Sequence, residues 1–288
     1  MKGQEARIAS QALGYIEENL DKKLELETIA AALHYSKYHL HRSFARTVGM
    51  TMHAYVQRRR LTEAARLLVF SRKPIWEIAY VGGYESQQAF TSCFKEMYKK
   101  TPAQYRTMEN FYPLQFAMCL DGEPAAMDLE ESDVSAATPA DMDDWMELAR
   151  LAVDGYPCLN EAEYRGNLYR HISSGQALIL RDEGRAAGVL AFTAEKGWID
   201  FLAVHPQYRS LGIAGILLNR LRAELPRGAE ISVTTYREGD RADTGYRKAY
   251  LRLGFEEREL LTEYGYPTQR FVLPSERKEA AFDDADAG

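Results

Sequence analysis

The chain has 288 residues, which is enough for two domains that each bury a hydrophobic core. No apolar run approaches the length of a membrane helix and the N-terminus has no apolar signal region, so we expect a soluble, cytoplasmic protein without a membrane partner. The first 108 residues carry 17 basic and 10 acidic side chains, a net +7, whereas the remainder carries 19 and 32, a net −13. The basic part therefore predicts a polyanionic partner that the acidic part does not share.

The cysteines and histidines predict no metal site. Cys93, Cys119 and Cys158 have neither metal-ligand nor disulfide spacing, so we expect reduced, buried thiols. His39 and His41 lie two residues apart on a predicted helix and therefore point to different faces.

The change in charge and periodicity divides the chain. We predict an N-terminal domain at 1–108, a connecting segment at 109–132 and a second domain at 133–274. The apolar stretch 111–120 predicts that the connecting segment is either docked on a domain or forms an extra strand. The tail 275–288 has no core pattern, so we expect it to lack a fixed structure.

The basic part contains an internal repeat. Residues 28–51 and 77–101 each read as a short helix, a turn and a second helix with apolar residues at i and i+4. This pattern is typical of two helix-turn-helix motifs, at about 24–51 and 74–101, joined by a long helix at 53–70.

The outward sides of the two second helices carry residues that suit DNA. Arginine pairs well with guanine, and glutamine with adenine, in the major groove. Polar residues on one exposed helix face are usually only solvated, but two such helices in tandem on a basic domain favour DNA reading. The residues predicted to face double-stranded DNA are Lys37, Tyr38, His41, Arg42, Gln87, Gln88, Thr91 and Ser92.

Residues 8–106 resemble the DNA-binding domain of the AraC/XylS family through "YSKYHLHRSF", "RRLTEAARLL", "IWEIAYVGGYESQQAFTSCFK" and "TPAQYR". The resemblance implies that both motifs enter successive major grooves, so DNA binding does not require a dimer, and it leaves RNA polymerase open as a further partner. Many members have arginine at the position of Ser92, so one contact of the family is missing here. Arg46 is a candidate phosphate contact. The run Arg58, Arg59 and Arg60 suggests a phosphate patch, although the resemblance implies that at least Arg60 braces the domain.

The acidic part alternates strands and helices. We predict a strand at 134–138, helices at 139–153 and 161–174, strands at 177–182, 186–194 and 198–204, a helix after Gly212, a strand at 230–236, a helix at 244–253 and further strands within 256–273. Three strands in series predict antiparallel pairing, and the strand-helix-strand unit that follows predicts a parallel pair. The fold class is therefore a multidomain one, an all-α tandem helix-turn-helix module followed by a mixed α/β domain.

The stretch "VHPQYRSLGIAG" at 204–215 joins a strand to a helix through Arg209, Gly212 and Ala214. Amide groups and the positive dipole end of a helix start can hold an anion, Gly212 lets the backbone approach it, and Arg209 adds charge. The stretch lacks the lysine of a P-loop. Taken alone, a glycine at a strand-to-helix turn is more often explained by backbone geometry.

Together with "AYLRLGF" at 249–255, this stretch makes residues 133–273 resemble the GNAT N-acetyltransferase superfamily. The resemblance implies acetyl-CoA as cofactor and direct transfer of its acetyl group to an amine. It implies that the amides of Leu202, Ala203 and Val204 bind the pantetheine arm, that Arg209, Leu211, Gly212, Ile213, Ala214 and Gly215 hold the pyrophosphate, and that Tyr250 is the general acid.

A base must take the proton of a protonated amine before the amine attacks a thioester. Asp200 is the first candidate, because a carboxylate within an apolar strand is costly to bury without a task, and we expect it on the same face as Leu202. Glu238 is a rival. The loop 153–164 either lines a pocket for a cationic amine or is a solvated acidic surface. The polar loop 237–243 departs from the family, in which many members have an asparagine before the final helix.

We therefore expect a transcription regulator that carries an acetyl-CoA-dependent N-acetyltransferase for a small amine. The alternative is a regulator whose second domain senses an acyl-CoA or another small ligand without turnover.

Overall fold

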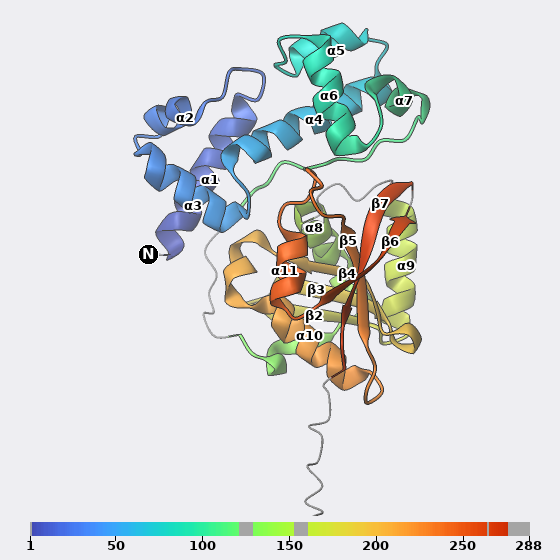
Figure 1. The fold of residues 1–288 in the computed structure, drawn as a ribbon. Coiled ribbons are helices and arrows are strands. Elements are labelled where there is room, and N and C mark those ends of the chain that lie inside the picture. The colour runs from blue at the N-terminus through green and yellow to red at the C-terminus, as the bar shows by residue number, and fades with distance from the viewer. Residues whose placement is uncertain (1, 121–128, 153–160, 264, 276–288) are drawn as a thin grey trace, which may run out of the picture.

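The computed structural model describes residues 2–120, 129–152, 161–263 and 265–275. The N-terminal domain consists of the helices α1 (Lys2–Glu18), α2 (Leu26–Ala32), α3 (Lys37–Val48), α4 (Met52–Phe70), α5 (Ile75–Val81), α6 (Gln87–Tyr98) and α7 (Pro102–Thr107). Figure 1 shows this helical domain above a sheet domain, with the connecting segment running between the two. In the part of the chain that the structure describes, no helix combines the length and apolar character needed to cross a membrane.

Local capping fixes the ends of α3 and α6, the second helices of the two repeats. The hydroxyls of Ser36 and Ser86 each accept a hydrogen bond from the amide three residues further on. Gly49 and Lys99 end these helices in the left-handed conformation. The predicted helix-turn-helix motifs are thus confirmed as α2–α3 and α5–α6.

The helix α4 serves both motifs. Tyr55, in its first half, belongs to the core around Phe44, and Leu61, further along, belongs to the core around Phe90. The predicted connecting helix is therefore confirmed, and it holds the two motifs together through two separate cores.

The three arginines of α4 brace the protein from within. Arg59 donates to a carboxylate of α1, and Arg60 donates to backbone carbonyls in the turn after α1. Arg58 is buried and donates to the carbonyls of Leu114 and Ala242. The interpretation of these residues as a phosphate patch is wrong, because their guanidinium groups already meet acceptors inside the protein.

The apolar part of the connecting segment is docked and forms no strand within residues 111–120. Leu114 and Leu120 are buried, whereas Cys119 is exposed. Cys93 in α6 is only half-buried. The expectation of buried thiols is wrong for these two cysteines, and Cys158 lies outside the described residues.

The sheet domain follows the predicted order of elements. It comprises the short 3-10 helices η1 (Glu131–Asp133), η2 (Pro139–Asp141), η3 (Ala194–Lys196) and η4 (Pro206–Leu211), the helices α8 (Met142–Ala152), α9 (Glu161–Ser173), α10 (Ile213–Glu224) and α11 (Tyr246–Arg252), and the strands β1 (Val134–Ala136), β2 (Ala177–Asp182), β3 (Arg185–Thr193), β4 (Trp198–Val204), β5 (Ile231–Tyr236), β6 (Glu256–Glu263) and β7 (Tyr266–Leu273). The strands form one sheet in the order β1-β2-β3-β4-β5-β7-β6. Among the described strands only β4 and β5 pair in parallel, so the mixed α/β prediction is confirmed. All but the first residue of the predicted tail 275–288 lies outside the described residues.

Helices cover both faces of this sheet (Figure 1). On one face, α8 and α9 bury Trp145 and Leu168 against Val189. On the other face, α10 and α11 bury Leu217 and Tyr250 against Leu190 and other strand residues. Because the side chains of β2, β3 and β4 are divided between these two layers, these three strands are largely apolar, whereas β6 at the edge of the sheet is mostly polar and exposed.

The parallel strands β4 and β5 are hydrogen-bonded at their first residues and separate beyond them. Trp198 and Ser232 are the only register pair found between β4 and β5 in the described residues. Gly197 fixes this closed end, because a side chain there would meet the carbonyl of Glu230 at 2.1 Å. Beyond it, the edge of β4 that faces β5 has backbone groups available for another partner.

Candidate functional site

The predicted DNA-facing residues lie on the outer sides of α3 and α6. Leu40 and Phe44 are buried beneath α3, whereas Tyr38 above them is 78% exposed. Lys37, Tyr38, His41, Arg42, Gln87, Gln88 and Ser92 are all exposed, and Thr91 is half-buried. Both helices therefore present polar side chains that no core contact occupies.

Two basic side chains near this surface are already paired. The Arg46 guanidinium lies 3.0 Å from the Glu5 carboxylate, and the Lys37 ammonium lies 3.3 Å from the Glu27 carboxylate. Exposed ion pairs of this kind contribute little to stability, because solvent screens them. A phosphate could replace either carboxylate at little cost.

The open edge of β4 lies between the two layers of helices. Leu202 and Val204 are half-buried on the side of α10, and Ala203 is buried on the side of α8. The strand then runs through η4 into α10. The three residues predicted to hold a cofactor arm are thus brought to the opening between β4 and β5.

The start of α10 has the geometry of an anion cradle. Gly212 adopts the left-handed conformation with φ of 76°, and a side chain built there would meet no atom within 4 Å. The first amide groups of a helix have no carbonyl partner within it, and their dipoles point the positive end outward. The turn therefore leaves open space beside the first amide groups of α10, and this space fits a phosphate group. The amide of Gly215 already donates to the carbonyl of Gly212 at 2.9 Å.

Arg209 of η4 extends toward the N-terminal domain. Its Nη1 donates to the carbonyl of Val48 at the end of α3, at 2.8 Å, and its Nη2 is buried without a hydrogen-bond partner among the residues that the structure describes. The sequence places Arg209 three residues before Gly212 but gives no sign of this contact, because Val48 lies 161 residues earlier.

Tyr250 lies on the α10 and α11 side of the opening, where it packs against Phe255 and Phe271. Its hydroxyl has no hydrogen-bond partner among the described residues. Burial, followed by the neighbouring Tyr246, raises the pKa of Tyr250 above its ordinary value. The phenol therefore remains protonated at neutral pH.

A second tyrosine, which the sequence did not single out, joins the two layers. The Tyr246 hydroxyl donates to the carbonyl of Ala152, at the end of α8, at 2.8 Å. This contact connects the helix that carries Tyr250 with the helix on the opposite face.

Asp200 lies at a bulge of β4. The register pairs Ala191 with Phe201 and Phe192 with Ile199, so Asp200 is the extra residue. The bulge turns its carboxylate toward α9, on the side of Phe201. The expectation that Asp200 shares a face with Leu202 is wrong, because the bulge breaks the alternation on which that expectation rested.

Because of the bulge, the carboxylate of Asp200 lies near the imidazole ring of His171 on α9. The Nε2 of His171 lies 3.8 Å from Asp200 Oδ2, which also accepts a hydrogen bond from the hydroxyl of Thr193 at 2.7 Å. The Nδ1 of His171 lies 3.0 Å from the carbonyl of Phe192, so Nδ1 carries a proton and donates it. Sequence spacing alone does not connect His171 with Asp200.

The remaining predicted elements have other surroundings. Glu238 is exposed in the loop 237–243, whose Asp240 lies 2.8 Å from Lys99 of the N-terminal domain. Of the loop 153–164, residues 153–160 lie outside the described residues. Tyr164 is described, and its hydroxyl accepts a hydrogen bond from Trp145 at 2.9 Å.

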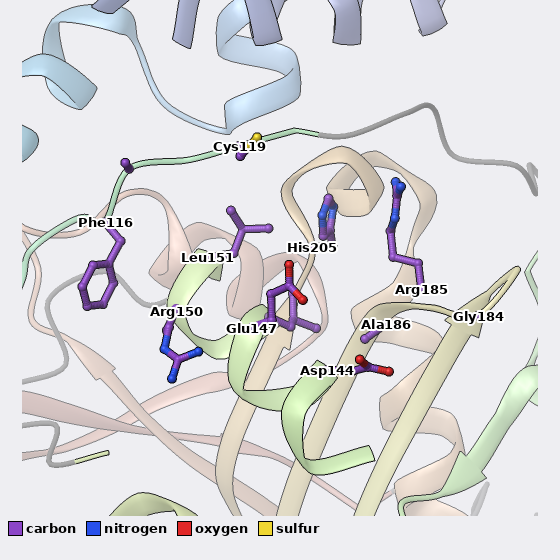
Figure 2. Close-up of a pocket in the computed structure, with 12 residues that line it drawn as sticks. Phe116, Cys119, Asp144, Glu147, Arg150, Leu151, Gly184, Arg185, Ala186 and His205 are labelled. Atoms are coloured by element: carbon purple, nitrogen blue, oxygen red, sulfur yellow. The ribbon is translucent and has the colours of Figure 1, made fainter. Parts of the chain in front are cut away.

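A cavity of about 540 Å³ lies between the connecting segment and the α8 side of the sheet domain. Figure 2 shows Phe116 and Cys119 of the connecting segment at one side, with Glu147 of α8, Arg185 of β3 and His205 at the other. Burial, and then the nearby Arg185 and Arg209, lower the pKa of His205 to about 4. The cavity is thus lined by a neutral imidazole and charges of both signs.

Two family models match the chain. A helix-turn-helix domain matches residues 29–108, and an acetyltransferase (GNAT) domain matches residues 173–257. The two matches correspond to the helical domain and to the central part of the sheet domain, including the opening and Tyr250.

Known proteins resemble one domain or the other. The chain is 40% identical over 102 residues to the transcriptional regulator Rob of Salmonella typhimurium. The aligned residues make up 35% of this chain and 35% of Rob. It is also 40% identical over 99 residues to the transposon Tn10 TetD protein of Escherichia coli. This alignment covers 34% of this chain and 72% of TetD. The solved structure of a GNAT-family acetyltransferase from Bacillus cereus superposes on 50% of this chain with 97% of its own residues. The sequence identity is 19% and the TM-score is 0.40. The chain therefore spans about a third of the length of Rob and most of TetD.

The tandem helix-turn-helix domain and the GNAT domain define a DNA-binding regulator with an acetyltransferase-type second domain. The chain belongs to the AraC-type helix-turn-helix regulators and carries a GNAT acetyltransferase domain after its DNA-binding domain, as both sequence resemblances predicted.

Proposed function

We propose that this regulator binds acetyl-CoA in the opening between β4 and β5 and transfers the acetyl group to a small amine. One observation carries the proposal: a protonated tyrosine flanks the opening on one face of the sheet, and a carboxylate with its histidine flanks it on the other. An acyl transfer to an amine needs an acid for the thiolate and a base for the amine.

The cofactor site is supported by the fit between its residues and the parts of acetyl-CoA. The open edge of β4 suits an amide-containing arm, which pairs with it as an added strand would. The turn at Gly212 and the amides that begin α10 suit the diphosphate, and the unpartnered Nη2 of Arg209 supplies a further donor. When bound, acetyl-CoA supplies an activated thioester.

The chain's own residues would then act in order. Asp200, with His171 beside it, takes the proton of the ammonium group, so that the free amine attacks the acetyl carbon. An amide of the open β4 edge donates to the carbonyl oxygen as negative charge develops on it. Tyr250 would give its proton to the departing sulfur and regain one from solvent, while the nitrogen, once bonded to the acetyl carbon, would lose its second proton to solvent. One proton is released overall, which balances the conversion of an ammonium group and a thioester into an amide and a thiol.

Acetyl-CoA with a panel of small amines tests this proposal, with free thiol release as the readout. Release above the background without amine is expected for at least one amine. We expect Tyr250→Phe to reduce this release about 100-fold, the lower end of what a positioned acid contributes. Release that survives in Tyr250→Phe unchanged would remove Tyr250 as the acid.

The second candidate is a sensor without turnover, and the cavity of about 540 Å³ beside the connecting segment favours it. This cavity has the size of a small-molecule site and touches the segment that joins the two domains. Thermal stabilisation by acetyl-CoA without thiol release for any amine would support the sensor.

For the N-terminal domain, we propose that α3 and α6 read double-stranded DNA through their eight predicted residues. Their exposure on two helices of one basic domain supports this role. A footprint that covers two successive turns of DNA with one bound chain is the expected result.

A further inference from the structure

The two loops that follow the open strands both reach the DNA-binding domain. The loop after β4 contains η4, and its Arg209 contacts the end of α3. The loop after β5 is 237–243, and its Asp240 contacts the end of α6. The second helix of each helix-turn-helix motif is therefore held at its C-terminal end by one side of the cofactor opening.

The end of α3 accommodates the guanidinium group of Arg209, because the residue that follows Val48 is a glycine. Gly49 ends α3 with φ of 83°, and a side chain built on it would lie 2.1 Å from Nη1 of Arg209. The guanidinium thus takes the place of a side chain and donates to the carbonyl of Val48. That carbonyl lies at the negative end of the helix dipole, which favours a positive charge.

The contact at α6 is independent of Arg209. Lys99, the residue that ends α6, lies 2.8 Å from the carboxylate of Asp240 and over the ring of Tyr266. Arg241 of the same loop also pairs with Glu96 of α6. The sheet domain therefore remains attached at α6 when the contact at α3 is broken.

We propose that acetyl-CoA and the α3 end compete for Arg209, so that cofactor binding weakens the binding of DNA. The inference rests on the proposed acetyl-CoA site. A diphosphate is a stronger acceptor for a guanidinium than a neutral carbonyl, because both partners of the hydrogen bond are then charged. In addition, the buried Nη2 of Arg209 has no acceptor among the described residues, since the carbonyl of Val48 accepts only from Nη1. A diphosphate would provide an acceptor for Nη2.

The contacts of the sheet domain with α3 and with α6 explain why cofactor binding should lower the affinity for DNA. With Arg209 on Val48, α3 and α6 are both fixed against the sheet domain. When Arg209 turns to the cofactor, α3 loses its attachment and α6 keeps its own. DNA binding must then order α3 again, and this cost lowers the affinity for DNA.

The test uses the full-length protein and a duplex that the wild type selects from a random pool. Acetyl-CoA at saturation should weaken binding of this duplex about fivefold or more, the lower end of typical coupling between two sites. Because coupling is reciprocal, the duplex should weaken acetyl-CoA binding by the same factor. Acetyl-CoA binding that leaves the duplex affinity unchanged, or increases it, overturns the coupling alone. Absence of acetyl-CoA binding overturns the proposed function and the coupling together.

Gly49→Ala separates the contact from the cofactor site, because it occupies the place of the guanidinium and leaves Arg209 itself intact. This variant should bind the duplex more weakly without cofactor, lose the response to acetyl-CoA, and bind acetyl-CoA at least as well as the wild type. Gly175→Ala is the matched control, since Gly175 has φ of 70° and open space around it. The control carries the same backbone strain and should keep the response. A response retained in a folded Gly49→Ala overturns the role of Arg209, and the reciprocal titrations of the wild type decide the coupling if Gly49→Ala does not fold.

Discussion

His171 Nε2 lies 3.8 Å from Asp200 Oδ2, and this pair connects α9 with the bulge of β4 beside the opening between β4 and β5. If the pair accepts the proton of the amine, Asp200→Asn should lower kcat/KM for the acetylated amine about 100-fold or more, because the base is lost. The affinity for acetyl-CoA should stay unchanged, as the carboxylate lies on the opposite side of the sheet from α10.

His171→Gln is the companion variant. If His171 accepts the proton together with Asp200, the variant should shift the pH dependence of kcat/KM while acetyl-CoA binding stays the same. A purely structural role would change the unfolding temperature and leave the pH profile in place. Thr193→Val, which removes the hydroxyl that donates to Asp200, controls for the loss of a hydrogen bond to the carboxylate.

Tyr250→Phe should separate activity from stability. The hydroxyl has no hydrogen-bond partner among the described residues, so its removal leaves no buried acceptor unpaired. We expect the free energy of unfolding to change by less than about 1 kcal/mol, whereas acetyl transfer falls about 100-fold. Denaturant unfolding and the thiol assay on the same preparation measure both. A large loss of stability with proportionate loss of activity would reduce Tyr250 to a packing residue.

The elements of both domains could be predicted from the sequence because they depend on local patterns. Apolar periodicity defined α3, α6 and α10, and the repeat between residues 28–51 and 77–101 defined the tandem motifs. The order of strands gave the antiparallel and parallel pairing. These features require only neighbours in the chain and the alternation of side chains.

The contacts between distant segments could not be predicted in the same way. The bulge at Asp200 reversed the face of its side chain, and a one-residue irregularity of this kind leaves no signal in the alternation. The contact between Arg209 and Val48 joins two domains through a backbone carbonyl, which has no side-chain signature. Arg58 looked like part of a surface patch, but its partners come from two other segments, and only the fold brings them to it.

Arg42→Ala tests DNA reading on α3. Arg42 is exposed on the same side as Tyr38. If it reads a base, the variant should weaken binding of the selected duplex by about 1–3 kcal/mol, that is roughly 5- to 150-fold, and change binding to random DNA much less. Equal losses on both duplexes in a fluorescence titration would make Arg42 a phosphate contact.

Arg46→Ala is the matched comparison for Arg42. If Arg46 contacts phosphate, its loss should weaken both duplexes alike and reduce the dependence of affinity on salt concentration. The exposed pair with Glu5 predicts little change in stability.

Arg58→Ala should act on stability. The buried guanidinium donates to Leu114 in the connecting segment and to Ala242 in the loop 237–243, so its loss leaves buried carbonyls without these donors. We expect a loss of about 2–4 kcal/mol in the free energy of unfolding. Arg72→Ala, at an exposed position, is the control and should stay within about 0.5 kcal/mol of the wild type. Calorimetry of both variants measures this, and an unchanged unfolding temperature for Arg58→Ala would contradict the bracing role.

His205 predicts how stability depends on pH. Burial, then Arg185 and Arg209, lower its folded pKa to about 4 from 6.5, so the folded protein keeps the ring neutral where the unfolded chain takes up a proton. The stability from this residue is complete above pH 6.5 and is lost as the pH falls from 6.5 toward 4. At pH 5 the loss amounts to about 2 kcal/mol. Urea unfolding of the wild type and of His205→Gln at about pH 7.5 and pH 5 isolates this contribution, because all other groups titrate in both proteins. The difference between the two should shrink at the lower pH, and a difference independent of pH would contradict the assignment of a neutral, buried His205.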